Sequence, residues 1–276
     1  MTAARTPPDV PVGGLPVSFL LDFDGTISLL DVGDTILSRH GPSAEVIAHK
    51  DALYDDGVIG SRELMRWDLD VLPDDAGLLL REAAGIPLDD TLVDLVGWAR
   101  SRGAAVEVVS DGFGFHVEPA LARLGIDDIP IATNHWSMAG GGAGLSFPFG
   151  HPHCFVCGTC KRERVRAHQA ADRAVVFVGD GTSDRYACAH ADVVFAKGSL
   201  ADWCRREGWP HRTWDRLSEV TDWCATAVDD GGLPTTADEV ADWRRRCAPP
   251  QPRTFICGPE FWGPDRSVPL APTVNI

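Results

Sequence analysis

The fold of this 276-residue chain is decided by one stretch near its start, Phe19-Leu20-Leu21-Asp22-Phe23-Asp24-Gly25-Thr26. The apolar run that begins at Val17 and leads into this stretch is typical of a strand buried on both faces inside a parallel sheet. Asp22 and Asp24 follow at a spacing of two, which places both carboxylates on one side of an extended chain. The backbone amides of a tight turn at the next two residues can face an anion. The combination indicates a site for a divalent metal and a phosphate, because the metal neutralises carboxylates that would otherwise repel each other.

Three further segments with charged or hydroxyl side chains follow in the chain. A second apolar run ends on Ser110, and a third ends on Asp180, with Asp184 four residues later. Between these runs, Lys161 begins a predicted helix, in a chain whose lysines are at positions 50, 161 and 197 alone. A single Asp-x-Asp pair in a surface turn would carry little information by itself. The four segments in this order are a far more specific indication of function than any one of them alone.

The order of the four segments resembles that of the haloacid dehalogenase-type phosphatase superfamily, subfamily IB. The resemblance implies an α/β fold, a Rossmann-like doubly wound parallel sheet with a small helical cap inserted between the first two motifs. Alternating predicted strands and helices beyond residue 103 favour the same sheet, with ligands gathered at the carboxyl ends of its strands. The resemblance also implies Mg²⁺-dependent hydrolysis of a small-molecule phosphomonoester through an aspartyl-phosphate intermediate.

Each motif residue takes an expected role from this resemblance. Asp22 is expected to be the nucleophile, and Asp24 to protonate the leaving group and then activate water. Ser110 and Lys161 are expected to hold the phosphoryl oxygens, because the anionic phosphorus centre repels nucleophiles unless its charge is offset. The implied Mg²⁺ ligands are Asp22, the backbone carbonyl of Asp24, Asp180 and Asp184.

The carboxylate at Asp24 separates the reaction classes of the superfamily. A dehalogenase lacks an acid at this place, since its leaving halide needs no proton, so Asp24 favours phosphoryl chemistry. Two alternatives share most of the site: a phosphomutase or phosphotransferase acting on a small metabolite, and a catalytically inactive phosphate-binding module. An inactive module would be expected to have lost at least one motif, and this chain has all four.

Acidic residues beside the motifs narrow the substrate. Asp31 resembles the acidic substrate-reading residue of the phosphoserine phosphatase branch. Asp111 and the cysteine-rich segment before the third motif are closer to phosphoethanolamine/phosphocholine phosphatases and 2-hydroxy-3-keto-5-methylthiopentenyl-1-phosphate phosphatases. Desolvated carboxylates need a cation or hydrogen-bond donors, so we expect a substrate with an amine or several hydroxyls, unless these acids merely cap helices or face water. The predicted substrate-binding residues are Asp31, Asp34, Asp111, Gly112 and Arg62.

A cluster of soft ligands precedes the third motif. His153, Cys154, Cys157 and Cys160 lie in one short segment and could hold a structural zinc ion in tetrahedral geometry. The alternative is a loop of buried thiols before the helix. The sequence leaves both interpretations open, so structural Zn²⁺ is a second candidate cofactor beside Mg²⁺.

The composition excludes some classes of partner. A formal net charge of −15 and a pI near 4.9 disfavour binding to nucleic acid or to an anionic membrane. No stretch approaches the roughly 20 apolar residues of a membrane span. The N-terminus also lacks the basic-then-apolar pattern of a secretion signal. We therefore expect a cytoplasmic enzyme that acts on a small phosphorylated metabolite, with a homodimer left open as its oligomeric state.

The predicted organisation is a core interrupted by the cap. Residues 1–15 are expected to form a flexible lead-in, 16–30 and 103–228 the core, 31–102 the cap and 229–276 a C-terminal extension. Helices are predicted at 43–56, 61–72, 73–84, 87–102, 114–124, 161–171, 182–190, 200–207 and 236–246. Strands are predicted at 104–110, 174–178 and 193–196, with a hairpin at 129–149.

Overall fold

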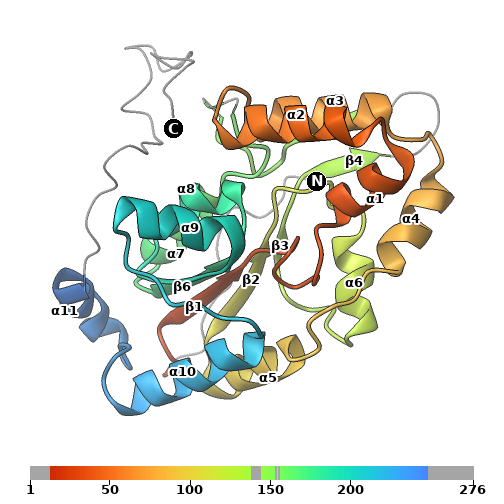
Figure 1. The fold of residues 1–276 in the computed structure, drawn as a ribbon. Helices are drawn as coiled ribbons and strands as arrows, with labels where there is room; N and C mark the ends of the chain where they lie inside the picture. Colours follow the sequence, from red (N-terminus) through yellow and green to blue (C-terminus); the bar gives the residue numbers. More distant parts are fainter. Residues whose placement is uncertain (1–12, 138–143, 153, 155, 248–276) are drawn as a thin grey trace.

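A five-stranded parallel sheet of order β3-β2-β1-β6-β7 forms the centre of the molecule (Figure 1). The computed structural model describes residues 13–137, 144–152, 154 and 156–247. The strand from the decisive stretch, β1, is the middle one, and its Leu21 lies beside Val108 of β2 and Val178 of β6. The predicted doubly wound parallel sheet is confirmed. Its strands are β1 (Val17–Leu21), β2 (Ala105–Val109), β3 (Ile131–Ala132), β6 (Ala174–Gly179) and β7 (Val193–Ala196).

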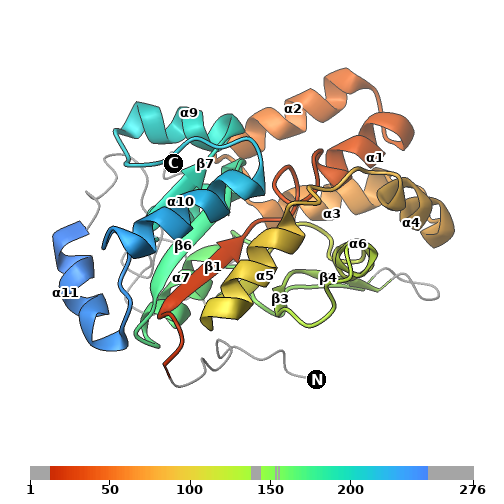
Figure 2. The same cartoon turned by 90° about the horizontal axis from the view of Figure 1, so that it is seen from below.

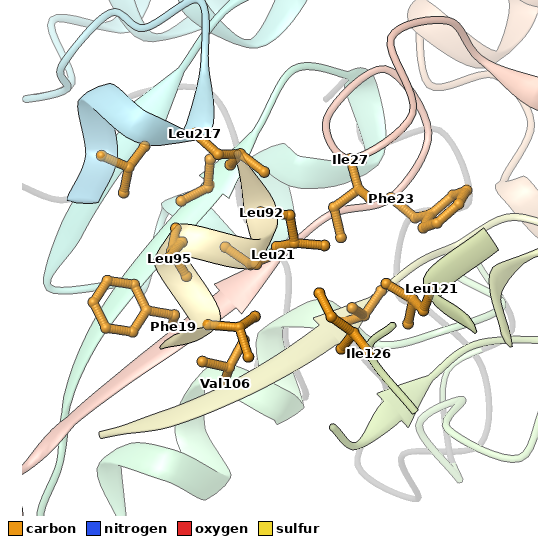
Figure 3. Close-up of a cluster of buried hydrophobic side chains, with 14 of the residues drawn as sticks. Phe19, Leu21, Phe23, Ile27, Leu92, Leu95, Val106, Leu121, Ile126 and Leu217 are labelled. Carbon is orange, nitrogen blue, oxygen red and sulfur yellow. The ribbon is translucent and has the colours of Figure 1, made fainter. Parts of the chain in front are cut away.

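Alternate residues of the central strand face two helical layers. Phe19 and Leu21 belong to a buried cluster with one pair of helices (Figure 3), and Leu20 belongs to a second cluster with the other pair. Helices thus cover both faces of the sheet (Figure 2), which is why its strands are nearly continuous apolar runs. Burial of each such side chain contributes about 1.5 to 3 kcal/mol. The first pair is α5 (Leu92–Arg102) with α10 (Leu217–Asp229), and the second is α7 (Lys161–Gln169) with α9 (Gly198–Glu207).

Five helices lie between β1 and β2 in the chain: α5, which packs on the sheet, and the four that precede it and form the insertion. Two of them have a side-chain cap at the N-terminus: Asp31 accepts a hydrogen bond from the N–H of Asp34 (2.8 Å), and Asp75 accepts one from Leu78 (2.9 Å). Figure 1 shows α2 and α3 together at the top of the view, with α5 and α10 at the bottom. The cap boundaries stay a prediction, although α5 contacts β2 and α10 and so lies with the sheet. The four helices are α1 (Val32–His40), α2 (Ala44–Asp55), α3 (Ser61–Val71) and α4 (Ala76–Ala84).

Some predicted helices differ from the observed ones. Helix α5 begins at Leu92 and not at residue 87, because Asp89 folds the preceding residues into a turn by accepting from the N–H of Thr91 (3.0 Å). The predicted helix at 182–190 is divided into a 3₁₀ turn, Thr182–Asp184, and the short α8, Arg185–Cys188. Helix α10 is absent from the predictions.

The predicted hairpin at 129–149 is only partly right. Its first apolar run, β3, joins the main sheet parallel to β2, where Ala132 lies beside Val109. The hairpin itself is smaller and pairs β4 (His135–Ser137) with β5 (Gly144–Ser146). The predicted helix at 114–124 is also shorter, α6 (Val117–Arg123), because Gly114 has a left-handed backbone (φ +77°) that a helix cannot include.

The two ends of the described chain are attached to the core. Leu15, the last residue of the predicted lead-in, is buried and donates its N–H to the carbonyl of Arg102 (2.7 Å). Residues 1–12 lie outside the described part, so the lead-in stays a prediction. The last described helix, α11 (Ala237–Cys247), is joined to the core by Arg244, which binds the carboxylate of Asp192 (2.7 Å). None of the helices described is long and apolar enough to cross a membrane.

A buried cluster of charged side chains joins α7 to the sheet. Glu107 of β2 is 1% exposed and accepts two hydrogen bonds from Arg164, at 2.8 and 2.9 Å. Its second oxygen also lies 2.6 Å from Nε2 of His168, whose Nδ1 lies 2.8 Å from the Ser18 hydroxyl of β1. Both hydrogen-bonding residues of α7 are thereby fixed against two strands. The cluster holds in place the helix that begins at Lys161.

Candidate active site

Lys161 lies at the centre of the candidate site. It is 1% exposed, and its Nζ lies 2.5 Å from Oδ1 of Asp22 and 2.6 Å from Oδ1 of Asp184. Nζ also donates to the hydroxyl of Ser183 at 2.9 Å. Burial would lower the pKa of Lys161, but the two carboxylates raise it above its usual value, so the ammonium stays charged. A fixed cation therefore stands beside the predicted nucleophile.

Three carboxylates at the ends of β1 and β6 converge on one point. One oxygen each from Asp22, Asp180 and Asp184 lies within 4.8 Å of the others. Burial and the charge of Asp184 raise the pKa of Asp22 well above its usual value despite the opposing effect of Lys161, and the same two causes raise the pKa of Asp180 to about 7. Carboxylates that repel one another in this way suit a hard cation such as Mg²⁺, which takes oxygen ligands. The role predicted for the backbone carbonyl of Asp24 stays a prediction.

Asp24 is held at the edge of this cluster. Its Oδ1 accepts the N–H of Val32 (3.1 Å), and its Oδ2 accepts the hydroxyl of Ser110 (3.4 Å). Sequence reasoning missed His116, a buried residue whose Nε2 lies 3.4 Å from the Asp24 carboxylate. Burial would raise the pKa of Asp24, but His116 and the Val32 N–H together lower it below its usual value. Nothing in the spacing of His116 from the motifs marks it in the sequence.

Two glycines let the motif loops approach each other. Gly25 has a left-handed backbone (φ +75°), and a Cβ there would lie 2.1 Å from Oδ2 of Asp180. A Cβ on Gly112 would lie 2.5 Å from Oδ2 of Asp24. The N–H of Gly112 donates to the Ser110 hydroxyl at 3.0 Å, which orients that hydroxyl. Side chains at either position would push apart the carboxylates that the site brings together.

The predicted acids Asp31 and Asp34 lie at a cavity of about 170 Å³ that also reaches the motif carboxylates. Both residues are exposed, and Asp31 also caps α1. The role of Asp31 in substrate binding stays a prediction. Gly112 and Asp111 line the same cavity. The side chains of Tyr54 and Asp68, which the sequence analysis did not single out, line it from α2 and α3.

The carboxylate of Asp111 makes hydrogen bonds within the protein, and its predicted role in substrate binding stays a prediction. Its Oδ1 accepts the N–H of Thr159 (2.7 Å) and the side-chain amide of Asn134 (3.1 Å). Burial raises the pKa of Asp111, and hydrogen bonds from Ser61 and Thr159 oppose the rise. The carboxylate thus fastens the segment that leads to the third motif, and a substrate would have to compete for the same oxygen.

The Asp111→Ala variant should consequently lose activity on all substrates to a similar degree. The loop before the third motif loses its acceptor, and we expect the free energy of unfolding to fall by about 1 to 3 kcal/mol. Thermal melting and kcat/KM for two unlike phosphomonoesters measure this. Asp127→Ala, on an exposed loop residue, is the control and should change stability by less than about 0.5 kcal/mol. A loss confined to one substrate would return Asp111 to substrate recognition.

The side chain of Arg62 contacts the segment that contains the cysteines. Its Nε donates to the backbone carbonyl of Cys157 (2.6 Å), and its guanidinium carbon lies 4.8 Å from the centre of the Phe147 ring. It does not line the cavity that holds the motif carboxylates. The assignment of Arg62 to the substrate stays a prediction, and its contacts with Cys157 and Phe147 fasten α3 to the cysteine segment.

The zinc prediction is not supported by the described residues. Cys154, Cys157 and Cys160 are all buried, but they form no group of three converging ligands, and His153 lies outside the described residues. Burial raises the pKa of Cys160 to about 12, whereas a zinc ligand must be a thiolate. The alternative interpretation of buried thiols before the helix agrees with this arrangement.

The geometry agrees with the family to which the chain belongs. Residues 19–188 match the family of haloacid dehalogenase-like hydrolases, and the chain is a member of it. All four motifs of the site fall within these residues. Together with the relatives below, this makes the chain a phosphatase of the haloacid dehalogenase type.

Two curated relatives are similar over most of their own length. The 2-hydroxy-3-keto-5-methylthiopentenyl-1-phosphate phosphatase of Exiguobacterium sp. is 28% identical over 73% of this chain and 94% of its own. The protein of the same name from Brevibacillus brevis is 28% identical over 72% and 90%. A solved phosphoserine phosphatase, in the form of a phospho-aspartyl intermediate analogue, has the same fold with a TM-score of 0.57. It is 19% identical and covers 75% of this chain and 97% of that one.

Proposed function

We propose that the protein hydrolyses a small phosphomonoester through an aspartyl-phosphate on Asp22. The observation that carries the proposal is the placement of buried Lys161 at 2.5 Å from Asp22, with Asp24 two residues away and tied to Ser110. A fixed cation and hydroxyl beside a carboxylate nucleophile offset the charge of a phosphoryl group.

The reaction proceeds in two displacements. The Asp22 carboxylate attacks phosphorus as the bond to the leaving oxygen breaks, and Asp24, which must carry a proton when this step begins, gives that proton to the leaving oxygen. Asp24 then takes a proton from the water that attacks the aspartyl-phosphate, which releases inorganic phosphate and restores Asp22. Ser110 and Lys161 hold phosphoryl oxygens throughout. The Val32 N–H keeps Asp24 oriented through both steps.

A Mg²⁺ ion held by Asp22, Asp180 and Asp184 would neutralise the charge of the phosphoryl oxygens. Removal of divalent metal with EDTA should abolish phosphate release from an aryl phosphate, and Mg²⁺ should restore it. Mg²⁺ at a hundred times its Kd should stabilise the fold by about 2.7 kcal/mol, and Asp180→Asn should reduce this gain. Phosphate assays and thermal melting measure both effects. Activity that survives complete chelation would exclude the metal from the mechanism.

Two substrate chemistries are supported by different observations. The acids at the cavity favour a phosphomonoester with an amine or several hydroxyls. The names of the two curated relatives favour 2-hydroxy-3-keto-5-methylthiopentenyl-1-phosphate, and Leu37, Leu64 and Met65 give the cavity an apolar side that suits a methylthio group. A panel of phosphorylated metabolites distinguishes them by kcat/KM. A phosphomutase or phosphotransferase would return the phosphoryl group to an organic acceptor in the same assay. The cytoplasmic location and the homodimer stay predictions.

A further inference from the structure

The cavity at the candidate site has two chemically different ends. One end holds the motif carboxylates Asp22, Asp24 and Asp180. The other is made by the insertion, which lines the cavity with Leu37, Leu64 and Met65 as well as with acidic side chains. Among the described residues that line the cavity, none is a lysine or an arginine. The acids of the insertion therefore face no fixed cation across this space.

Asp68 of α3 is the acid most affected by the lack of a cation. It is 7% exposed, it lines the cavity, and its Oδ1 has no hydrogen-bond partner. No ion pair involves it among the residues that the structure describes. The nearest influence of opposite charge is Lys50, but its ammonium lies 5.6 Å from the centre of the Trp67 ring and not at the cavity.

An acid in this position is costly to the fold. Burial, with the neighbouring carboxylates Asp34 and Asp51, raises the pKa of Asp68 to about 8. A buried polar oxygen without a partner destabilises the folded state, and natural folds keep few of them. Asp70, two residues further along the same helix, is exposed and shows that α3 can place an aspartate in water. The cost of Asp68 is explained if a ligand supplies the missing partner.

We propose that Asp68, with Asp34 at the mouth of the cavity, binds the protonated amine of an aminoalkyl phosphomonoester and thereby selects the substrate. This proposal rests on the phosphatase function argued above and narrows it. An ammonium brings both hydrogen-bond donors and the positive charge that the lining lacks. A hydroxyl brings a donor without the charge, and a ketone brings neither. An adjacent cation also favours the ionised carboxylate, so the ligand and Asp68 stabilise each other's charge.

Three phosphomonoesters of matched size test the proposal: aminoethyl, hydroxyethyl and propyl phosphate. Wild-type protein should hydrolyse the amine with a kcat/KM at least about tenfold above the other two, as expected for a charged hydrogen bond. Asp68→Asn should remove this preference by lowering kcat/KM for the amine alone. Asp70→Asn is the matched control and should keep the preference.

The other outcomes separate this proposal from the phosphatase function. Equal kcat/KM for the three compounds, or a preference that survives in Asp68→Asn, overturns the role of Asp68 while leaving the phosphatase intact. Hydrolysis of an aryl phosphate without hydrolysis of aminoethyl phosphate also overturns the role of Asp68 and leaves the phosphatase function intact. Hydrolysis of none of the compounds, aryl phosphate included, overturns both. A purely structural role for Asp68 would lower the Tm of Asp68→Asn and its kcat/KM for all three compounds alike, which contradicts the proposal as well.

Discussion

Replacement of Asp22 by asparagine should reduce phosphate release from an aryl phosphate by at least about a thousandfold. The amide cannot attack phosphorus, and it also removes one of the three carboxylates that converge at the metal site. Lys161 keeps Asp184 and Ser183 as partners, so the pocket should stay folded around the substitution. Steady-state assays with Mg²⁺ in excess measure the loss.

Asp24→Asn gives the contrast that assigns the two roles. Its activity should fall by about a hundred- to ten-thousandfold, because the leaving group and the attacking water both lose their proton carrier. A good leaving group should still phosphorylate Asp22 in this variant, so covalently bound phosphate should be detectable by mass spectrometry after a rapid quench. Thermal melting controls for folding in both variants. Substantial turnover by Asp22→Asn would mean that another group attacks phosphorus.

Glu107→Gln should destabilise the protein by about 3 to 5 kcal/mol, far from any substrate. The substitution keeps the volume but leaves Arg164 as a buried guanidinium without its carboxylate. Urea unfolding at neutral pH measures the change. Glu163→Gln, on the same helix, is the control: its side chain is 43% exposed and lies 3.5 Å from Arg162, a pair worth about 1 kcal/mol at most.

The difference in stability between wild type and Glu107→Gln should depend on pH in a definite direction. Burial would raise the pKa of Glu107, but hydrogen bonds from His168 and Arg164 lower it below its ordinary value of 4.5. A carboxylate whose pKa is lowered by folding stabilises the folded state at pH values above its ordinary pKa. This stabilisation is lost as the pH falls through the lowered pKa. Wild type and Glu107→Gln should therefore differ most above pH 4.5 and converge in acid. Equal stability of the two at neutral pH would show that the cluster is not ionised.

The parts of the site that sequence could predict are those attached to strand ends. Asp22, Ser110 and Asp180 each follow an apolar run, and the carboxyl ends of parallel strands meet at one edge of a sheet. The helix that begins with Lys161 was predicted for the same reason, since it precedes a strand of the same alternation. Local pattern and topology agree at these positions.

The parts that sequence could not predict depend on side-chain direction. Asp68 and Asp70 are both aspartates of α3, yet Asp68 is buried at the cavity and Asp70 is exposed. Arg62 turns toward the carbonyl of Cys157, and His116 reaches Asp24 from a loop of no regular period. The directions of these side chains depend on how the insertion packs on the core. The spacing of residues within one segment does not predict that packing.

The position of β1 in the middle of the sheet has a consequence for synthesis of the chain. One neighbour of β1, β2, lies beyond the whole insertion, and the other, β6, begins only at Ala174. During synthesis, β1 therefore stays without one or both of its neighbouring strands until β6 has been made. Pairing between strands so far apart in the sequence is slow. Until Asp184 has left the ribosome, the nucleophile loop has no complete site around it, so catalysis and the burial of an aggregation-prone strand begin together.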